Sequence, residues 1–124
     1  MSKIAELKNG LYTYKCTLVR VIDGDTIIAK VDLGFDTWSL RNIRLIDIDA
    51  PEIRTKDLQE KKEGYAAKDY LETILAKNNL KDEFYLKSVG YDDFGRSLGH
   101  VYTVDGILIN KVLVDEGFAD VWKK

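Results

Sequence analysis

The sequence RLIDIDAPE occupies residues Arg44–Glu52 and contains Pro51, the only proline of the chain. Before this run the chain is rich in β-branched and aromatic residues, as strands are, and after it the apolar residues recur at helical spacing. A proline fixes its own φ and keeps the preceding residue extended, so the carbonyl of Ala50 should point in a defined direction. The run therefore predicts the end of a strand, followed by a loop that leads to a helix.

Three predicted strands precede this loop, and two follow the helix. They cover about residues 11–22, 26–33, 38–48, 83–89 and 97–104. The turn Asp23-Gly24-Asp25 should join the first two into a hairpin. Two further turns are expected, at residues 33–36 and 90–95, where glycine and aspartate gather.

The longer predicted helix is Gln59–Lys77, which should end at Asn78-Asn79. Its helical spacing is carried by Ala67, Leu71, Ile74, Leu75 and Asn78. A shorter helix is expected at Asn110–Glu116, with Gly117 as its C-terminal cap. Strands and helices in this order predict a mainly β, α+β fold: a five-stranded OB-type Greek-key barrel with one long helix packed on it and a short C-terminal helix.

The composition indicates one domain over residues 1–124. A net charge of −2 argues against tight, non-specific binding to duplex DNA but leaves room for a small catalytic site. The lone Cys16 excludes an internal disulfide, and we expect it to be buried and inert. The N-terminus lacks the apolar region of a secretory signal and no window could span a membrane, so a cytoplasmic monomer without membrane contact is expected, with a secreted mature form as the alternative.

Two acidic turns could hold a metal ion. Asp23-Gly24-Asp25-Thr26 taken alone is a hairpin turn with solvated aspartates, and Asp47–Glu52 taken alone is a polar strand end. Together they offer carboxylates beside the Ala50 carbonyl, a set of oxygen ligands that suits Ca²⁺ or another hard cation. Glu52 lies close enough in sequence to hold a water next to such an ion.

Two arginines are candidates for binding a phosphate. Arg44 and Asp49 are five residues apart and would point to opposite faces of a regular strand, so they can share a site only if the chain breaks near Asp47 or Ile48. The alternative for Arg44 is a surface arginine paired with a neighbouring acid. Arg96 ends the predicted turn at residues 90–95, as a rim arginine or as a second guanidinium on the same phosphate.

Five motifs resemble the staphylococcal-nuclease-like (thermonuclease) family, over about residues 15–121. They are Val21–Thr26, Arg44–Glu52, Gly64 with Ala67, Phe94–Arg96, and Asn110–Val114 with Gly117. The single histidine, His100, lies in a predicted strand, so a histidine-based metal site or a Ser-His-Asp triad is not expected. The resemblance implies an OB-type barrel and a Ca²⁺-dependent, sugar-nonspecific nuclease that cleaves DNA and RNA, preferably single-stranded, and leaves 3′-phosphate ends.

The resemblance also implies a role for each motif residue. The carboxylates of Asp25 and Asp49 and the backbone carbonyl of Ala50 would bind Ca²⁺ or another hard divalent cation. Asp23 would stand beside these ligands without touching the ion. Glu52 would be the general base. Arg44 and Arg96 would bind the scissile phosphate.

Two departures from the family pattern concern the substrate. Asp93 and Phe94 stand where studied members carry lysine and tyrosine, and the chain stops at Lys124, before the tyrosines that stack on a base. We therefore expect weak nucleotide binding and a high KM. A catalytically silent OB-type module that binds nucleic acid or protein is the alternative function, and an exposed apolar patch away from the acidic turns would favour a partner-binding role.

Overall fold

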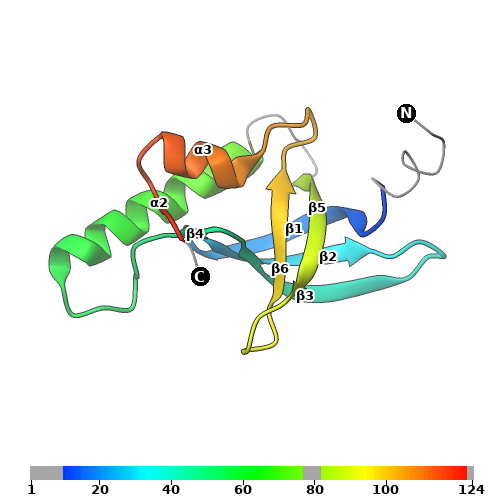
Figure 1. The fold of residues 1–124 in the computed structure, drawn as a ribbon, viewed down its shortest axis with the longest axis horizontal. Coiled ribbons are helices and arrows are strands. Elements are labelled where there is room, and N and C mark those ends of the chain that lie inside the picture. Colours follow the sequence, from blue (N-terminus) through cyan, green and yellow to red (C-terminus); the bar gives the residue numbers. More distant parts are fainter. Residues whose placement is uncertain (1–9, 77–81, 123–124) are drawn as a thin grey trace.

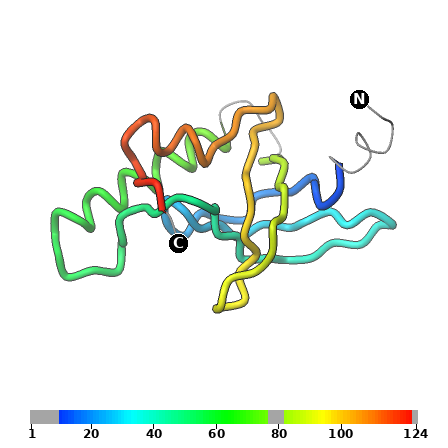
Figure 2. Tube along the Cα trace, viewed as in Figure 1, coloured from blue at the N-terminus to red at the C-terminus, as the bar shows by residue number. Residues whose placement is uncertain are grey.

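A computed structural model describes residues 10–76 and 82–122 of the chain. Its elements are β1 Thr13–Asp23, β2 Thr26–Asp32, β3 Trp38–Leu45, β4 Ile48–Asp49, α2 Leu58–Ala76, β5 Glu83–Tyr91, β6 Ser97–Tyr102, α3 Ile109–Asp115 and β7 Asp120–Val121. The helices lie together at one end of the molecule, and the β2–β3 hairpin extends from the other end (Figures 1 and 2). The expected end of the long helix at Asn78-Asn79 lies outside the described residues.

Five of the strands form a closed barrel in the order β1-β2-β3-β6-β5. Neighbouring strands are antiparallel except for β3 and β6, which are parallel. Closure between β1 and β5 leaves the barrel without a free edge. This arrangement confirms the predicted fold, including the hairpin at Asp23-Gly24-Asp25, where Asp23 pairs with Thr26.

The core fills the barrel and continues under both helices. Its largest fully buried side chains are Phe84, Ile27, Ile43, Leu45, Leu71, Leu86, Ile109, Leu113, Val101 and Cys16. Helix α2 buries Ala67, Leu71 and Leu75, as its spacing predicts, and Ile74 is half-buried. It also buries Gly64. The Cys16 thiol is buried as expected, and burial, with the nearby charge of Asp32, raises its pKa to about 12. No helix of the described ranges is long and apolar enough to cross a membrane.

The third strand is shorter than its sequence predicts. It was expected to reach Ile48, but β3 ends at Leu45 and the chain turns at Ile46-Asp47, where Asp47 has a φ of 66°. This turn confirms the predicted break. After it, β4 leaves the barrel and pairs with β7, a small sheet for which the sequence shows no signal. Strand β5 is instead longer than expected, because its last residue, Tyr91, pairs with Ser97.

Candidate functional site

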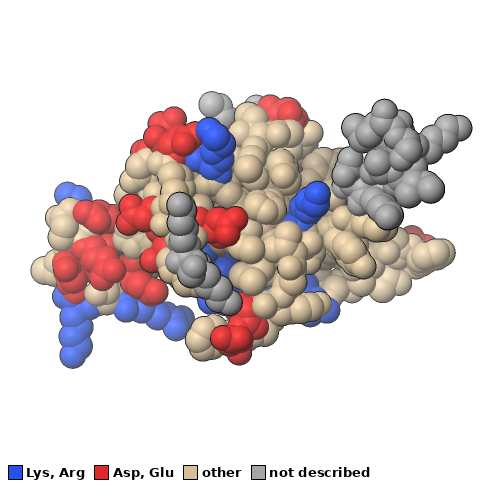
Figure 3. Space-filling model, viewed as in Figure 1, with Lys and Arg blue, Asp and Glu red and all other residues tan. Residues whose placement is uncertain are grey.

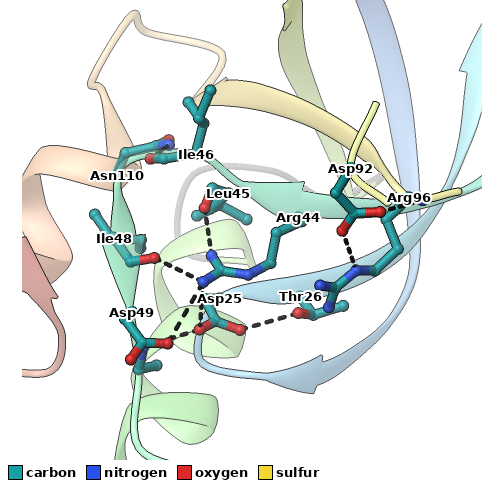
Figure 4. A network of polar contacts seen from close by, with 11 residues as sticks. Asp25, Thr26, Arg44, Leu45, Ile46, Ile48, Asp49, Asp92, Arg96 and Asn110 are labelled. Carbon is teal, nitrogen blue, oxygen red and sulfur yellow. Dashed lines mark hydrogen bonds and ion pairs between the residues drawn. The ribbon is translucent and has the colours of Figure 1, made fainter. Parts of the chain in front are cut away.

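The break after β3 brings Arg44 between two aspartates. Arg44 Nη2 lies 3.4 Å from Asp25 Oδ2 and 3.5 Å from Asp49 Oδ1 (Figure 4). The same guanidinium donates hydrogen bonds to the carbonyls of Leu45 at 2.5 Å and Ile48 at 2.8 Å. Both carbonyls belong to the chain that bends away from the barrel. Arg44 therefore holds the bend in place and joins the two acidic motifs at one point.

Asp25 is fixed in position by three hydrogen bonds. Its Oδ1 accepts the Thr26 hydroxyl at 2.9 Å, its Oδ2 accepts the Ala50 N–H at 2.8 Å, and its backbone carbonyl accepts the Leu45 N–H at 2.8 Å. The side chain of Asp25 is 9% exposed, whereas that of Asp49 is 60% exposed. A buried carboxylate is stable only when it is paired and hydrogen-bonded, as this one is. Asp25 thus forms the rigid side of the site, and Asp49 forms the side open to solvent.

Two further carboxyl groups, those of Glu52 and Asp23, have a pKa raised in part by this cluster. Glu52 is exposed, but its carboxyl group is partly desolvated by the surrounding protein. This desolvation, together with the charges of Asp23, Asp25, Asp49 and Glu60, raises its pKa above the ordinary value. Burial and the Asp25 carboxylate likewise raise the pKa of Asp23, against the opposing charges of nearby basic groups. The acids at residues 23, 25, 49 and 52 therefore form one electrostatic group. A raised pKa also makes Glu52 a better proton acceptor near neutral pH.

Arg96 is held by Asp92, at the turn between β5 and β6. Its Nε donates to Asp92 Oδ2 at 2.5 Å, and its backbone N–H donates to Asp92 Oδ1 at 2.9 Å. Burial acts to raise the pKa of Asp92, but these bonds, with one from the Phe94 N–H, lower it overall. The guanidinium also lies 5.5 Å from the centre of the Phe94 ring. The role of Asp92 was missed, because neither the turn motif nor its spacing shows which acid of the Asp92-Asp93 pair faces the arginine.

A pocket of about 420 Å³ brings the two arginines together. Arg44, Asp49 and Arg96 lie in its wall, whereas Asp23, Asp25 and Glu52 do not. The remaining wall includes three exposed aromatic residues, Tyr91, Phe94 and Trp122. Sequence reasoning did not select Tyr91 or Trp122. Tyr91 joins β5 only by pairing with Ser97, and the Trp122 N–H donates to the carbonyl of Asp47, which is far away in the sequence.

The donors at this site suit a hard cation better than a soft one. In residues 10–76 and 82–122, no group of three or more His, Cys, Asp or Glu side chains has the arrangement to hold a metal ion. The available set is the pair of carboxylates, Asp25 and Asp49, with Ala50 brought beside Asp25 by its own N–H bond. Such a set suits an ion that also takes backbone carbonyls and waters, as Ca²⁺ does. It does not suit zinc, which prefers histidine and cysteine.

Comparison with known proteins agrees with this geometry. The family model for staphylococcal nuclease homologues matches residues 42–124, more than half of the chain. The chain is 34% identical over 114 residues to endonuclease YhcR of Bacillus subtilis, and the match covers 88% of this chain and 9% of that protein. It is 33% identical over 109 residues to an uncharacterized endonuclease of Escherichia coli O157:H7, and this match covers 86% of this chain and 60% of the relative. It is 32% identical over 107 residues to the thermonuclease of Staphylococcus hyicus, and this match covers 86% of this chain and 57% of the relative.

The chain therefore spans less than two thirds of the length of each of these relatives. The family match nevertheless includes the bend after β3, Glu52, the long helix α2 and the Arg96 turn. By its sequence and by its barrel, this chain belongs to the staphylococcal nuclease family.

Proposed function

We propose that the chain is a Ca²⁺-dependent, sugar-nonspecific nuclease that hydrolyses phosphodiester bonds in DNA and RNA and leaves 3′-phosphate ends. The observation that carries the proposal is the position of Arg44. This residue is within 3.5 Å of both Asp25 and Asp49 and lines one pocket with Arg96. Phosphate-binding cations and metal-binding carboxylates thus meet at one place, as phosphodiester hydrolysis requires.

In the proposed reaction the two arginines bind the scissile phosphate. Glu52 takes a proton from water, the water oxygen forms a bond to phosphorus, and the bond from phosphorus to the 5′ oxygen breaks. The leaving oxygen gains a proton, so the products are a 3′-phosphate and a 5′-hydroxyl. Arg44 and Arg96 stabilise the additional charge of the transition state. Ca²⁺ bound by Asp25, Asp49 and Ala50 would supply further positive charge beside the phosphate.

We further propose that single-stranded nucleic acid is the preferred substrate. Tyr91, Phe94 and Trp122 are exposed around the pocket that holds the arginines. A base stacked on an aromatic side chain contributes about 1–3 kcal/mol, and only an unpaired base presents its face freely. Stacking on these aromatic residues should recover part of the binding free energy that we expect to be lost around Asp93.

A digestion assay tests the proposed activity. Wild-type protein should degrade single-stranded DNA and RNA with Ca²⁺ and stop when a chelator is added. Glu52→Gln and Arg44→Ala should each lower kcat by about two to four orders of magnitude, with circular dichroism showing that the fold is kept. The matched controls are Glu72→Gln on α2 and Arg41→Ala on β3, both exposed, which should cleave at nearly the wild-type rate. Near-wild-type activity of either site variant would refute the assignment.

A second candidate function rests on the far end of the barrel. Leu33, Phe35, Trp38 and Leu40 are exposed on and beside the β2–β3 hairpin, which points away from the helices (Figure 1). On the face seen in Figure 3, charged residues gather at the helical end, and the barrel is mainly uncharged. Exposed apolar side chains that lie close together can bind a partner. Wild-type protein that folds but shows no Ca²⁺-dependent cleavage would favour this binding function.

A further inference from the structure

Helix α2 touches both loops that carry the acidic residues. Gly64 and Ala67 are three residues apart, so they lie on the same face of the helix, and both are buried. Gly64 meets the backbone of the loop that carries Glu52, and Ala67 meets the turn that carries Asp25. The same rigid element therefore contacts the general base and the metal-binding turn.

The contact at Gly64 leaves no room for a side chain. A Cβ atom there would lie 2.9 Å from the Pro51 carbonyl oxygen and 3.0 Å from the carbonyl carbon and oxygen of Glu52. All three are backbone atoms, which cannot rotate away as a side chain can. A methyl group at Gly64 must therefore displace the Glu52 loop or the helix.

The contact at Gly24 is closer still, and of another kind. A Cβ atom there would lie 2.5 Å from the Ala67 Cβ and 3.0 Å from the Ala50 Cβ. Gly24 and Gly64 are both absent from the residues with positive φ, so lack of space, and not backbone strain, is what favours glycine at these positions. Unlike the contact at Gly64, the two nearest atoms here are methyl carbons, with the backbone carbon of Ala67 farther off at 3.3 Å. The nearer methyl, that of Ala67, can be removed by substitution.

We propose that α2 sets the distance between Glu52 and the pair Asp25 and Asp49, with Gly64 and Ala67 as positioning residues. This inference rests on the proposed function, because it concerns the geometry of the same site. A shift of about 1 Å in a reacting group can lower the rate about a hundredfold. A helix that contacts both loops through nothing larger than a methyl group leaves little freedom for such a shift.

The first experiment separates catalysis from metal binding. Gly64→Ala should lower kcat about tenfold to a hundredfold, because it moves Glu52. The Kd for Ca²⁺, measured by calorimetry, and the KM should both change less than kcat does, because the added methyl meets the backbone of Pro51 and Glu52 and neither Asp25 nor Asp49. The control is Ala66→Ser, which adds one atom at an exposed neighbouring position and should change none of these values.

The second experiment moves a methyl group from Ala67 to Gly24, across the contact between α2 and the Asp25 turn. Gly24→Ala should weaken Ca²⁺ binding about tenfold, because it pushes the Asp25 turn away from α2. The double variant Gly24→Ala with Ala67→Gly removes the opposing methyl and should recover Ca²⁺ affinity to within about threefold of wild type. Ala67→Gly and Ala66→Gly, made singly, correct for the lower helix propensity of glycine.

Backbone amide chemical shifts provide a readout that needs no activity. Gly64→Ala should shift the amides of Glu52 and Ile53 more than that of Asp25, and Gly24→Ala should show the reverse. The proposal is overturned if Gly64→Ala keeps the wild-type kcat, or if the double variant fails to recover Ca²⁺ affinity. If Gly64→Ala does not fold, the exchange across Gly24 decides alone. Wild-type protein without nuclease activity would refute the proposed function, whereas unchanged shifts in both variants would refute the positioning role.

Discussion

Arg44 contacts four acceptors, one on the β1–β2 turn and three on the segment that follows it in the chain. It contacts the carboxylates of Asp25 and Asp49 and donates to the carbonyls of Leu45 and Ile48. A planar guanidinium can satisfy several acceptors at once, whereas a lysine ammonium would act as a compact point charge. The residue proposed to bind phosphate is therefore also the one that compensates the buried charge of Asp25, and its rate effects must be measured on folded protein.

The raised pKa of Glu52 predicts that removing its charge stabilises the protein. Burial and the neighbouring carboxylates raise this pKa in the folded state, so the folded protein holds the proton more tightly than the unfolded chain does. The stability gained from that proton is fully present below the unfolded pKa and is lost as pH rises through the folded pKa. In chelator at pH 7, Glu52→Gln should therefore raise Tm, and its advantage should shrink as pH falls. Glu72→Gln should leave Tm unchanged, and a lower Tm for Glu52→Gln would contradict the expectation.

Asn110 shows how one buried amide can support the site from a distance. Its Oδ1 accepts the Val101 N–H at 2.8 Å, and its Nδ2 donates to the carbonyls of Ile46 at 3.0 Å and Gly99 at 3.2 Å. We expect Asn110→Ala to lower the free energy of unfolding by about 2–4 kcal/mol, because it leaves buried backbone groups unpaired. Urea denaturation measures the loss, with the exposed Asn42→Ala as control. A loss below about 1 kcal/mol would show that these bonds stabilise little.

The turn between β5 and β6 is built around a single carboxylate. Asp92 accepts the N–H groups of Phe94 and Arg96 and the Arg96 side chain, while its own N–H donates to the Arg96 carbonyl at 3.0 Å. Gly95 has a φ of 80°, a conformation that glycine adopts without strain. The hairpin therefore fixes the direction of one arginine by means of its own loop.

We predict that Asp92→Ala lowers kcat/KM about tenfold or more, because Arg96 loses the acceptor that orients it. The neighbouring exposed residue supplies the matched control: Asp93→Ala changes the same net charge and should keep or raise kcat/KM, because the lost carboxylate repels the substrate phosphate. Steady-state kinetics on single-stranded DNA measure both. Equal losses in the two variants would mean that charge, and not orientation, is responsible.

On the scale of the whole molecule, the site lies where the barrel meets the β4–β7 sheet and the loop that leads to α2. The end of β3 carries Arg44, the small β4–β7 sheet carries Asp49, and the loop before α2 carries Glu52. The net charge of −2 provides no general attraction to nucleic acid, so we expect phosphate binding to depend on the two arginines of the pocket. The barrel supplies Arg44 and Asp25 of the proposed site, and the segments that leave it supply Asp49 and Glu52.

A Ca²⁺ ion that binds only the folded protein should stabilise the whole chain. At a free concentration about 100 times Kd, the gain in the free energy of unfolding is about 2.7 kcal/mol. We expect Ca²⁺ to raise the Tm of the wild type and to leave that of Asp49→Asn nearly unchanged. Asp69→Asn, an exposed change on α2, should respond as the wild type does. Equal responses of all three proteins would exclude Asp49 as a ligand.

The sequence alone determined the strands, the period of α2 and the position of the break near Asp47. These features depend on local patterns, such as alternation and helical spacing. The break was predicted because Arg44 and Asp49 would point to opposite faces of a regular strand. The motif residues were also recognisable, because their order along the chain is specific. Element ends were less certain, since the turn at Asp47 shortened β3 and pairing of Tyr91 with Ser97 lengthened β5.

Only the tertiary structure decided how these parts meet. It pairs β4 with β7, brings Tyr91 and Trp122 to the arginines, and gives Asp92 the task of holding Arg96. It also reveals why a glycine stands at position 64, where the helix touches the backbone of the loop that carries Glu52. Apart from the Asp92–Arg96 contact, which lies within one turn, these contacts have no local signal, because they join residues brought together by strand pairing or by packing of the helix. The sequence therefore names the reactive groups, and the packing determines their distances.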